Sequence, residues 1–259
     1  MEKSALIGYT GFVGSTLLNQ RKFTDLFRST NITDIRSKSY DLVICAGAPA
    51  KKWLANKDPV SDEFVIDNLI SHLQSVKAKK FILISTVDVF KSPQGVKENS
   101  EVQLEGLHAY GRNRFKLEEF VRRNFKNHLI IRLPGLVGRG LRKNIIFDFL
   151  NGNSLERIDS RNVFQFYPMQ YLCQDINRAL ELNLDLLHLT AAPLTVEEVA
   201  EHGFGICFKN QTTGPVVRYD MKTKYASHWG SESSYQYSKK ESLDAIKNYA
   251  RTEKRIVHE

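Results

Sequence analysis

The sequence predicts an α/β fold with a doubly wound parallel sheet. Three observations support this prediction: short apolar runs typical of buried strands, longer segments with helical spacing between them, and a glycine-rich turn after the first run. Consecutive parallel strands need a helix to return the chain, so this alternation favours a sheet with helices on both faces. With 259 residues, 42% of them hydrophobic, the chain can bury a substantial core.

The pattern assigns the elements in order. Strands are expected over residues 4–7, 23–27, 41–46, 81–84 and 128–133, and helices over 15–20, 59–76 and 110–125. The first helix continues from the glycine-rich turn, and a Pro-Gly pair ends the last of these strands. Beyond this region the pattern loosens. Helices are expected over 145–150, 174–182, 195–202 and 239–250, with irregular or short strand segments between them.

Composition narrows the classes of partner. The net charge is +8, but the basic residues are scattered and not interleaved with aromatic ones, so no nucleic-acid partner is expected. No apolar run approaches the roughly 18–20 residues that span a bilayer, and residues 2–7 do not resemble a secretory leader, so we expect a cytoplasmic protein without a membrane partner. The cysteines form no C-x-x-C pair and the histidines show no ligand spacing, so no metal site is expected.

The glycine-rich turn carries the prediction of a ligand. It reads Gly8-Tyr9-Thr10-Gly11-Phe12-Val13-Gly14 and joins the first strand to the first helix. The first glycine permits a tight turn, the second lets the backbone approach a pyrophosphate, and the third allows the helix to pack closely on the strand. Backbone N–H groups at Phe12 and Val13 then point at the anion, helped by the helix dipole. The turn therefore predicts binding of a dinucleotide.

The spacing of the glycines, three and three, with Thr10 before the second, resembles the extended short-chain dehydrogenase/reductase family of nucleotide-sugar epimerases, dehydratases and reductases. Four later segments resemble family motifs in the expected order: Cys45-Ala46-Gly47-Ala48, Ser85-Thr86 at a strand end, Tyr110-Gly111-Arg112-Asn113-Arg114, and Arg132-Leu133-Pro134-Gly135. The resemblance implies a Rossmann-type NAD(P)-binding domain over residues 1–138 and a small substrate-binding lobe over 139–259. It also implies that Ala46, Gly47, Ala48, Ser85 and Pro134 lie against the cofactor.

Within the resemblance, Tyr110 is the general acid/base and Thr86 anchors the substrate oxygen. Tyr110 and Arg114 are four residues apart, so they share one face of a helix. A nearby cation lowers the pKa of a tyrosine by stabilising its phenolate. The family has lysine where this chain has Arg114, which keeps the charge and the donors but is bulkier and does not release a proton. Arg114 is expected to contact the ribose, and a cofactor-binding protein with lost catalysis stays open as the alternative.

The end of the second strand bears on the choice of cofactor. An acidic residue there pairs with the ribose 2′-hydroxyl of NAD(H), whereas arginine accepts the 2′-phosphate of NADP(H). Arg28 and Ser29 follow the expected strand and no carboxylate occupies the place, so NADP(H) is favoured over NAD(H). Asp25 falls inside the expected strand, and a shift of two residues in the strand boundary would change this preference.

Cations at two other strand ends suit a phosphate-bearing small-molecule substrate. We expect Lys52 and Trp53, after the third strand, and Arg142 and Asn144, after the nicotinamide segment, to bind it, because ligands bind at the carboxyl ends of strands in open α/β sheets. The alternative is that these are solvated loop residues. By analogy with the family, the helices expected over 59–76 and 110–125 could form a homodimer. The function predicted is hydride transfer on a nucleotide-linked sugar or related carbonyl compound.

Overall fold

The computed structural model describes residues 2–255, which fall into two compact units. Both units are discontinuous along the chain. The first holds the residues up to Lys91 together with Ser100–Leu133 and Leu172–Leu187, and the second holds Ser92–Asn99, Pro134–Tyr171 and the chain from His188 onward. The division expected at residue 138 stays a prediction. In the described part of the chain, no helix combines the length and the apolar character needed to span a membrane.

The first unit is built on a six-stranded sheet. Its strands run in the order β10 (Leu186–His188), β6 (His128–Leu133), β4 (Lys77–Thr86), β3 (Ser39–Cys45), β1 (Ser4–Ile7) and β2 (Asp25–Phe27). β1 pairs in parallel with both β2 and β3, and β3–β4 and β4–β6 are also parallel. The strand order reverses at β1, between β2 and β3, which makes the carboxyl ends of β1 and β3 the point where ligands bind in such sheets. The α/β fold with a parallel sheet is confirmed.

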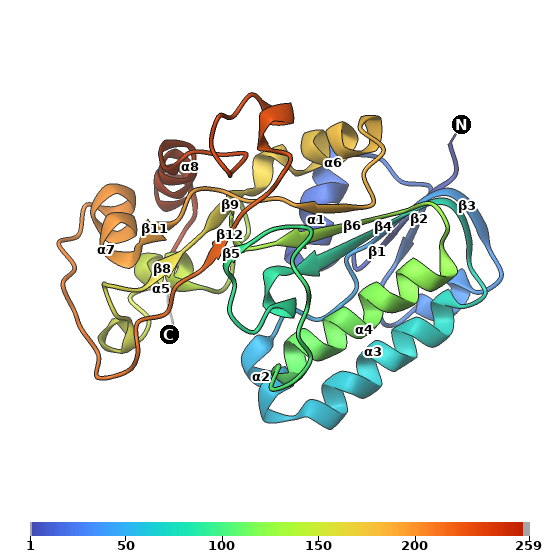
Figure 1. Cartoon of the computed structure of the whole chain (residues 1–259), viewed down its shortest axis with the longest axis horizontal. Helices are drawn as coiled ribbons and strands as arrows, with labels where there is room; N and C mark the ends of the chain where they lie inside the picture. The colour runs from blue at the N-terminus through green and yellow to red at the C-terminus, as the bar shows by residue number, and fades with distance from the viewer. Residues whose placement is uncertain (1, 256–259) are drawn as a thin grey trace. The chain divides into compact units, whose positions relative to one another are not determined.

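Helices cover both faces of this sheet, as Figure 1 shows. α1 (Phe12–Gln20) and α6 (Leu172–Glu181) lie on one face, and α3 (Pro59–Leu73) and α4 (Ala109–Asn124) lie side by side on the other. A shorter helix, α2 (Lys52–Lys57), precedes α3. The core under α3 and α4 contains a cluster of buried apolar side chains, in which the rings of Phe81 and Phe125 stack with centroids 4.1 Å apart.

Local sequence explains where these elements begin. Asp58 caps α3 by accepting a hydrogen bond from the Ser61 N–H at 3.1 Å, and Pro59 takes the first helical position, where its missing N–H costs nothing. α3 ends at Leu73, three residues before the boundary expected from its apolar spacing. The reason is that β4 begins at Lys77 and pairs with Ser39, so a stretch of lysines that the apolar pattern excluded belongs to the sheet.

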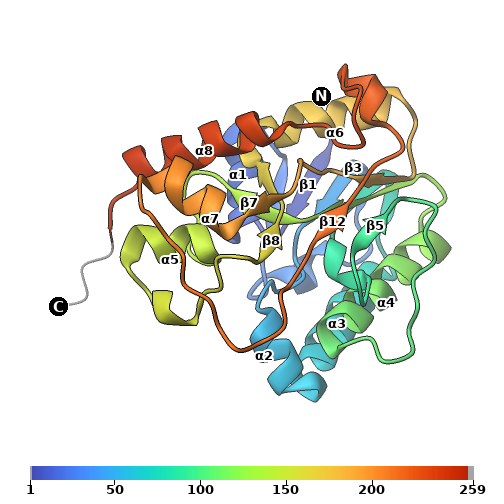
Figure 2. The same cartoon turned by 60° about the vertical axis from the view of Figure 1, so that its left-hand side comes forward.

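The described part of the second unit is built from short paired strands and helices, several of which are labelled in Figure 2. The strand pairs are β7 (Gly135–Val137) with β9 (Phe166–Pro168), β8 (Val163–Phe164) with β11 (Leu194–Thr195), and β5 (Gln94–Val96) with β12 (Asp220–Met221). The helices are α5 (Ile145–Asn151), α7 (Val196–Glu198), which continues as a π-helical turn over Val199–Gly203, and α8 (Lys239–Thr252).

A buried amide joins the strands of the second unit. The Gln165 Nε2 donates to the carbonyl oxygens of Ala191 and Met221 at 2.7 and 2.8 Å, and its Oε1 accepts from the Met221 N–H at 2.6 Å. The Glu98 carboxylate has a similar role, because it accepts from the His188 N–H and the Thr223 hydroxyl at 2.9 and 2.5 Å. Both side chains are satisfied, as buried polar groups must be, and they serve the fold of this unit.

Candidate functional site

The glycine-rich turn lies at the carboxyl end of β1, and each of its three glycines has a different environment. Gly8 has a φ of +83°, and a Cβ there would overlap the Ala46 backbone. A Cβ on Gly14 would overlap the carbonyl group of Gly8. In contrast, a Cβ on Gly11 would come no closer than 3.4 Å to the Gly8 oxygen, which is an ordinary contact. The chain itself therefore requires glycine at positions 8 and 14 but not at 11.

Gly11 is also the residue that precedes α1. Neither a capping side chain nor an acidic residue is present at the beginning of this helix among the described residues. The first N–H groups of a helix have no intrahelical partner, so the amides that begin at Phe12 offer donors and the positive end of the dipole. Thr10 and Gly11 are exposed, and Phe12 and Val13 are half-buried. This end of α1 is thus suited to an anion.

Two neighbouring strand ends flank the turn. The Gly8 N–H donates to the Phe27 oxygen at 2.8 Å, and the Ala46 N–H donates to the Ile7 oxygen at 2.9 Å. The ends of β2 and β3 therefore meet the glycines. Arg28 and Ser29 are exposed directly after β2, and Ala46, Gly47 and Ala48 are half-buried after β3. Asp25 begins β2, and its carboxylate accepts the Tyr40 hydroxyl at 2.6 Å.

Tyr110 is buried in the first turn of α4 and is 7% exposed. The preceding His108 caps the helix, because its Nδ1 accepts the Gly111 N–H at 3.0 Å. A Cβ on Gly111 would overlap the carbonyl oxygen of Asp88, so glycine allows α4 to approach the segment after β4. The Tyr110 N–H donates to the side-chain oxygen of Asn56, in α2, at 3.0 Å. Three elements thus fix where the phenol stands.

The phenol faces a cluster of polar groups. The Thr86 side chain, at the end of β4, is one of the groups that act on the phenol, and it favours the ionised form of Tyr110. The Thr86 hydroxyl also accepts the Asp88 N–H at 3.1 Å, and the Asp88 carboxylate forms an ion pair with the Lys52 ammonium at 2.7 Å. Burial raises the pKa of Tyr110, and the Arg114 guanidinium opposes this rise. The pKa of His108 is lowered, first by burial and then by the charge of Lys52.

Arg114 lies beneath Tyr110, one turn along α4, and is only 3% exposed. Its guanidinium carbon is 3.9 Å from the centroid of the Tyr110 ring, a cation–π distance. One Nη group forms an ion pair with Asp62 of α3, and the other donates to the Pro49 oxygen. The Nε has no hydrogen-bond partner among the described residues. The expected pairing of Tyr110 with a cation four residues later is present, and the contact of Arg114 with a ribose stays a prediction.

Ser85 precedes Thr86 and is engaged within the protein. Its hydroxyl donates to the Glu118 carboxylate at 2.6 Å, and Glu118 also pairs with Arg132 of β6 at 2.6 Å. Both charged side chains are almost completely buried. This network ties α4 to β4 and β6 and keeps the end of β4 in register with the helix that carries Tyr110. The role of Ser85 in cofactor binding stays a prediction.

The remaining expected residues lie in loops or short elements. Lys52 and Trp53 begin α2, and the Trp53 side chain is 68% exposed. In the second unit Pro134 is buried and Arg142 is exposed. Asn144 has a φ of +85° and caps α5, since its side-chain oxygen accepts the Ile146 N–H at 2.9 Å. Their contacts with a ligand stay predictions.

Sequence reasoning missed three side chains of this site: Asp62, Asp88 and His108. Asp88 and His108 had a readable signal, since each stands two residues from a predicted catalytic residue, Thr86 and Tyr110 respectively. Asp62 had none, because it lies 52 positions from Arg114. Within residues 2–255 there is no group of three or more His, Cys, Asp or Glu side chains that could hold a metal ion.

Comparison with known proteins finds similarity in structure. No protein-family model matches the chain, and no curated protein matches its sequence. The dTDP-4-dehydrorhamnose reductase of Bacillus anthracis, solved with NADP, has a TM-score of 0.75 at 16% identity, over 98% of this chain and 100% of that one. RMD of Pseudomonas aeruginosa, solved with NADPH, has a TM-score of 0.69 at 16% identity, over 97% and 99%. The UDP-glucose 4-epimerase of Thermotoga maritima, with UDP-glucose, has a TM-score of 0.69 at 16% identity, over 96% and 98%.

The chain shares the fold of these reductases and epimerases. The resemblance that the motifs predicted is confirmed at the level of the fold. A UDP-glucuronic acid 4-epimerase of Bacillus cereus, solved with NAD, also matches, at a TM-score of 0.67 and 17% identity over 96% of each chain. Solved structures with this fold therefore include complexes with NADP, NADPH and NAD.

Proposed function

We propose that this protein is an NADP(H)-dependent oxidoreductase or epimerase that acts on a nucleotide-linked sugar or a related carbonyl compound. One observation carries the proposal: a buried Tyr110 phenol, on which the Thr86 side chain at the end of β4 acts, stands over a guanidinium 3.9 Å from its ring centroid. A phenol, a hydroxyl and a cation in this arrangement suit proton transfer to and from a carbonyl oxygen. The shared fold with nucleotide-sugar reductases and epimerases supports the substrate class.

The glycine turn fits a dinucleotide. The open position at Gly11 supports this, because the nearest atom of the described residues to a Cβ there is the Gly8 oxygen at 3.4 Å, and the Cβ would fill space that a pyrophosphate could occupy. Thr10 to Gly14 would hold the phosphates, and Ala46, Gly47 and Ala48 would lie along the adenine side. The nicotinamide of a bound cofactor would supply or accept the hydride.

Arg28 and Ser29 support NADP(H) over NAD(H). Both are exposed after β2, and the Arg28 Nε donates to the Thr30 hydroxyl at 2.9 Å, a local contact that leaves the guanidinium at the surface. The one carboxylate in β2, Asp25, is held by the Tyr40 hydroxyl at the start of the strand, away from its carboxyl end. A 2′-phosphate would therefore meet a cation and a hydroxyl.

In the proposed reaction, Tyr110 donates a proton to the carbonyl oxygen during reduction and accepts one during oxidation. The Thr86 hydroxyl orients the same oxygen. Because burial raises the pKa of Tyr110, a base with this environment needs compensation, and the Arg114 charge supplies part of it. Lys52 and Trp53 are proposed to bind the substrate, as are Arg142 and Asn144 of the second unit, through its phosphates and sugar.

The test is turnover of purified protein with NADPH and a panel of nucleotide-linked 4-keto sugars, followed by the loss of NADPH absorbance. Tyr110→Phe should abolish turnover and leave NADPH binding, measured by calorimetry, largely intact. Unchanged turnover in Tyr110→Phe would remove the phenol from the mechanism.

Free thiols at Cys45, Cys173 and Cys207 are consistent with the proposed location in the cytoplasm, where they stay reduced.

A second candidate function is a non-catalytic NADP(H)-binding sensor or scaffold. The observation that favours it is the engagement of Arg114 by Asp62 and Pro49, which occupies both Nη groups of the cation. Its signature would be tight NADPH binding with no hydride transfer to any carbonyl offered. Arg114→Lys would then create or raise activity, whereas an active wild-type protein would exclude this candidate.

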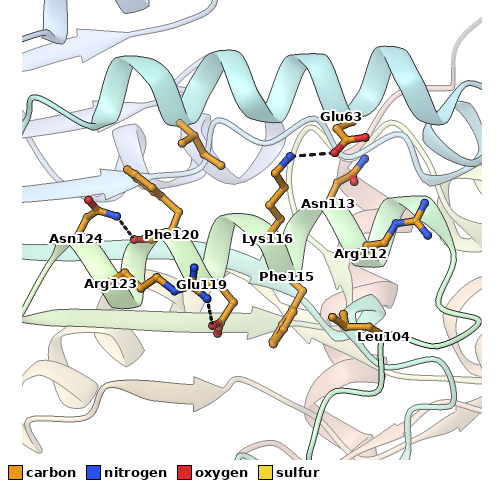
Figure 3. Close-up of a pocket in the computed structure, with 11 residues that line it drawn as sticks. Glu63, Leu104, Arg112, Asn113, Phe115, Lys116, Glu119, Phe120, Arg123 and Asn124 are labelled. Atoms are coloured by element: carbon orange, nitrogen blue, oxygen red, sulfur yellow. Dashed lines mark hydrogen bonds and ion pairs between the residues drawn. The ribbon is translucent and has the colours of Figure 1, made fainter.

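A homodimer is proposed through the outer face of α3 and α4. A groove of about 630 Å³ lies there, drawn in Figure 3, and its lining alternates apolar rings and aliphatic groups with charges of both signs. The residues that carry this pattern are Leu104, Phe115, Phe120, Arg112, Glu119 and Arg123. A two-fold interface uses the same patch on both copies, so the apolar side chains of this groove would pack against those of the second copy. Sedimentation should give a dimer for the wild type and a monomer for Leu104→Glu.

A further inference from the structure

The ion pair between Asp62 and Arg114 is the most deeply buried charge pair between α3 and α4. The side chains are 7% and 3% exposed, respectively. The Asp62 Oδ2 that accepts from Arg114 also accepts the Asn113 side-chain amide at 2.8 Å. A buried pair of this kind costs desolvation energy and stabilises the fold weakly, if at all, compared with apolar residues of the same volume. Its presence beneath Tyr110 therefore calls for a reason other than stability.

The guanidinium is held from three directions. The Asp62 carboxylate comes from α3, and the Pro49 carbonyl oxygen comes from the segment after β3. The main-chain carbonyl oxygen of Tyr110, 3.4 Å from the Arg114 Nη1, comes from α4 itself. The Nε has no partner within residues 2–255, so the contacts of the two Nη groups set the position of the cation. A lysine has one ammonium group on a flexible stem and would not match this planar fork. Of the three acceptors, only Asp62 carries a charge.

We infer that Asp62 is a positioning residue of the proposed site: its carboxylate holds the Arg114 guanidinium against the ring of Tyr110. The inference rests on the proposed function of Tyr110 as the acid/base. It also gives a physical reason for arginine where the related motif has lysine. Asp62, on the neighbouring helix, holds the guanidinium beside the phenol. The forked Arg114 side chain can contact both Asp62 and the Pro49 carbonyl oxygen at once.

Removing the Asp62 charge separates two effects of opposite sign on the phenol. If Asp62 serves only as a counter-charge, its loss leaves Arg114 in place with a stronger field, and the pKa of Tyr110 falls. If Asp62 positions the cation, its loss lets the guanidinium move from the ring, and the pKa of Tyr110 rises. The other groups that face the phenol, Asp88, Lys52 and His108, are unchanged in both cases.

The experiment is a pH titration of Tyr110 in the whole protein labelled with difluorotyrosine, whose phenol is more acidic, by ¹⁹F nuclear magnetic resonance. Tyr110→Phe assigns the signal. In Asp62→Asn the midpoint should rise by about one pH unit, the order expected for losing a neighbouring opposite charge. Asp62→Glu, which keeps the charge but shifts the carboxylate, should give a midpoint between those of the wild type and Asp62→Asn. A midpoint that falls or stays unchanged in a folded Asp62→Asn would overturn the inference.

Asp67→Asn is the matched control. Asp67 also pairs across the two helices, with Lys116 at 2.6 Å, but it is 49% exposed and lies on the outer surface. Its substitution should leave the Tyr110 midpoint unchanged. If Asp62→Asn proves too unstable to titrate, Asp62→Glu decides, because a longer carboxylate displaces the cation and should still raise the midpoint measurably. The titration needs neither substrate nor hydride transfer, so absence of turnover in the wild type would reject the proposed function without deciding this inference.

Discussion

The glycine turn after β1 and the pocket around Tyr110 are two halves of one proposed site, and they are specified in different ways. In the turn, backbone sterics decide: a Cβ at Gly8 or Gly14 would overlap main-chain atoms. In the pocket, burial and charges act together: burial raises the pKa of Tyr110, and the charges of Arg114, Asp88 and Lys52 shift it in both directions. Steric requirements leave a spacing that is visible in the sequence, whereas a balance of charges can be reached with different residues.

The chain can therefore differ from the related motif more easily in the pocket around Tyr110 than in the glycine turn. The turn admits no substitution at two of its glycines, so its motif is intact. The pocket tolerates arginine in place of lysine because Asp62, on the neighbouring helix, receives the larger cation.

The largest effect is expected from breaking the buried charge pair. Arg114→Met leaves the Asp62 carboxylate buried without its cation, and this should lower the free energy of unfolding by about 3–5 kcal/mol. Lys116→Met breaks the exposed pairs of the same two helices and should cost about 1 kcal/mol or less. Urea unfolding followed by circular dichroism measures both. Equal losses in the two variants would mean that burial does not distinguish these pairs.

Substitutions in the glycine turn should lower the stability less than Arg114→Met does, but they should weaken NADPH binding. Gly14→Ala places a methyl group against the Gly8 carbonyl and should lower the free energy of unfolding by about 1–3 kcal/mol, as overpacking usually does. Gly11→Ala meets only ordinary contacts and should cost about 1 kcal/mol or less. Both should weaken NADPH binding in calorimetry. Full NADPH affinity in Gly11→Ala would show that the pyrophosphate does not approach this residue.

His108, which caps α4, is expected to make the stability of the protein depend on pH. Because the pKa of His108 is lowered by burial, the folded protein binds the proton less readily than the unfolded chain. The stabilising contribution is therefore present above pH 6.5 and is lost as the pH falls through the lowered value. Protonation also removes the Nδ1 acceptor of the Gly111 N–H. His108→Asn keeps a capping oxygen and should reduce the loss of stability between pH 7 and 5 by about 1 kcal/mol.

Thermal unfolding at a series of pH values measures this effect. His72, whose pKa is also lowered, contributes to the pH dependence of both proteins, so the comparison rests on the difference between them. Identical slopes for His108→Asn and the wild type would exclude His108 as a source of the pH dependence.

The smallest effect on stability is expected at the second strand end. Arg28→Ala should weaken NADPH binding roughly tenfold, the size of one hydrogen bond to a charged group, and leave NADH binding unchanged. Stability should not change, because Arg28 is exposed. Parallel titrations with the two cofactors measure the preference. An equal loss for NADPH and NADH would place the 2′-phosphate elsewhere.

Much of the first unit could be predicted from sequence. β1 and β6 have the predicted bounds, and the turn between β1 and α1 was placed by the spacing of its glycines. β4 was predicted too short, because polar lysines at its beginning belong to the sheet only through pairing with β3. Asp62 could not be predicted, since nothing local in its helix indicates that a partner 52 positions away needs a carboxylate.

The second unit was the harder part. Its strands have two or three residues each, too short for a period of alternation to appear. Buried Gln165 and Glu98 hold them together through backbone groups far along the chain, and polar residues at such places oppose an apolar pattern. The helix expected over residues 239–250 is present as α8, which begins with a capping box at Ser238 and Glu241.

The interleaving of the two units constrains how such a protein could be divided or recombined. The chain leaves the first unit after Lys91, returns at Ser100, and crosses again after Leu133, Tyr171 and Leu187. A fragment ending at residue 138 would lose β10 and expose the edge of β6, and exposed edges invite aggregation. Exchange of the second unit between relatives would require three separate replacements, so new specificity is more readily acquired by point substitution than by transfer of a module.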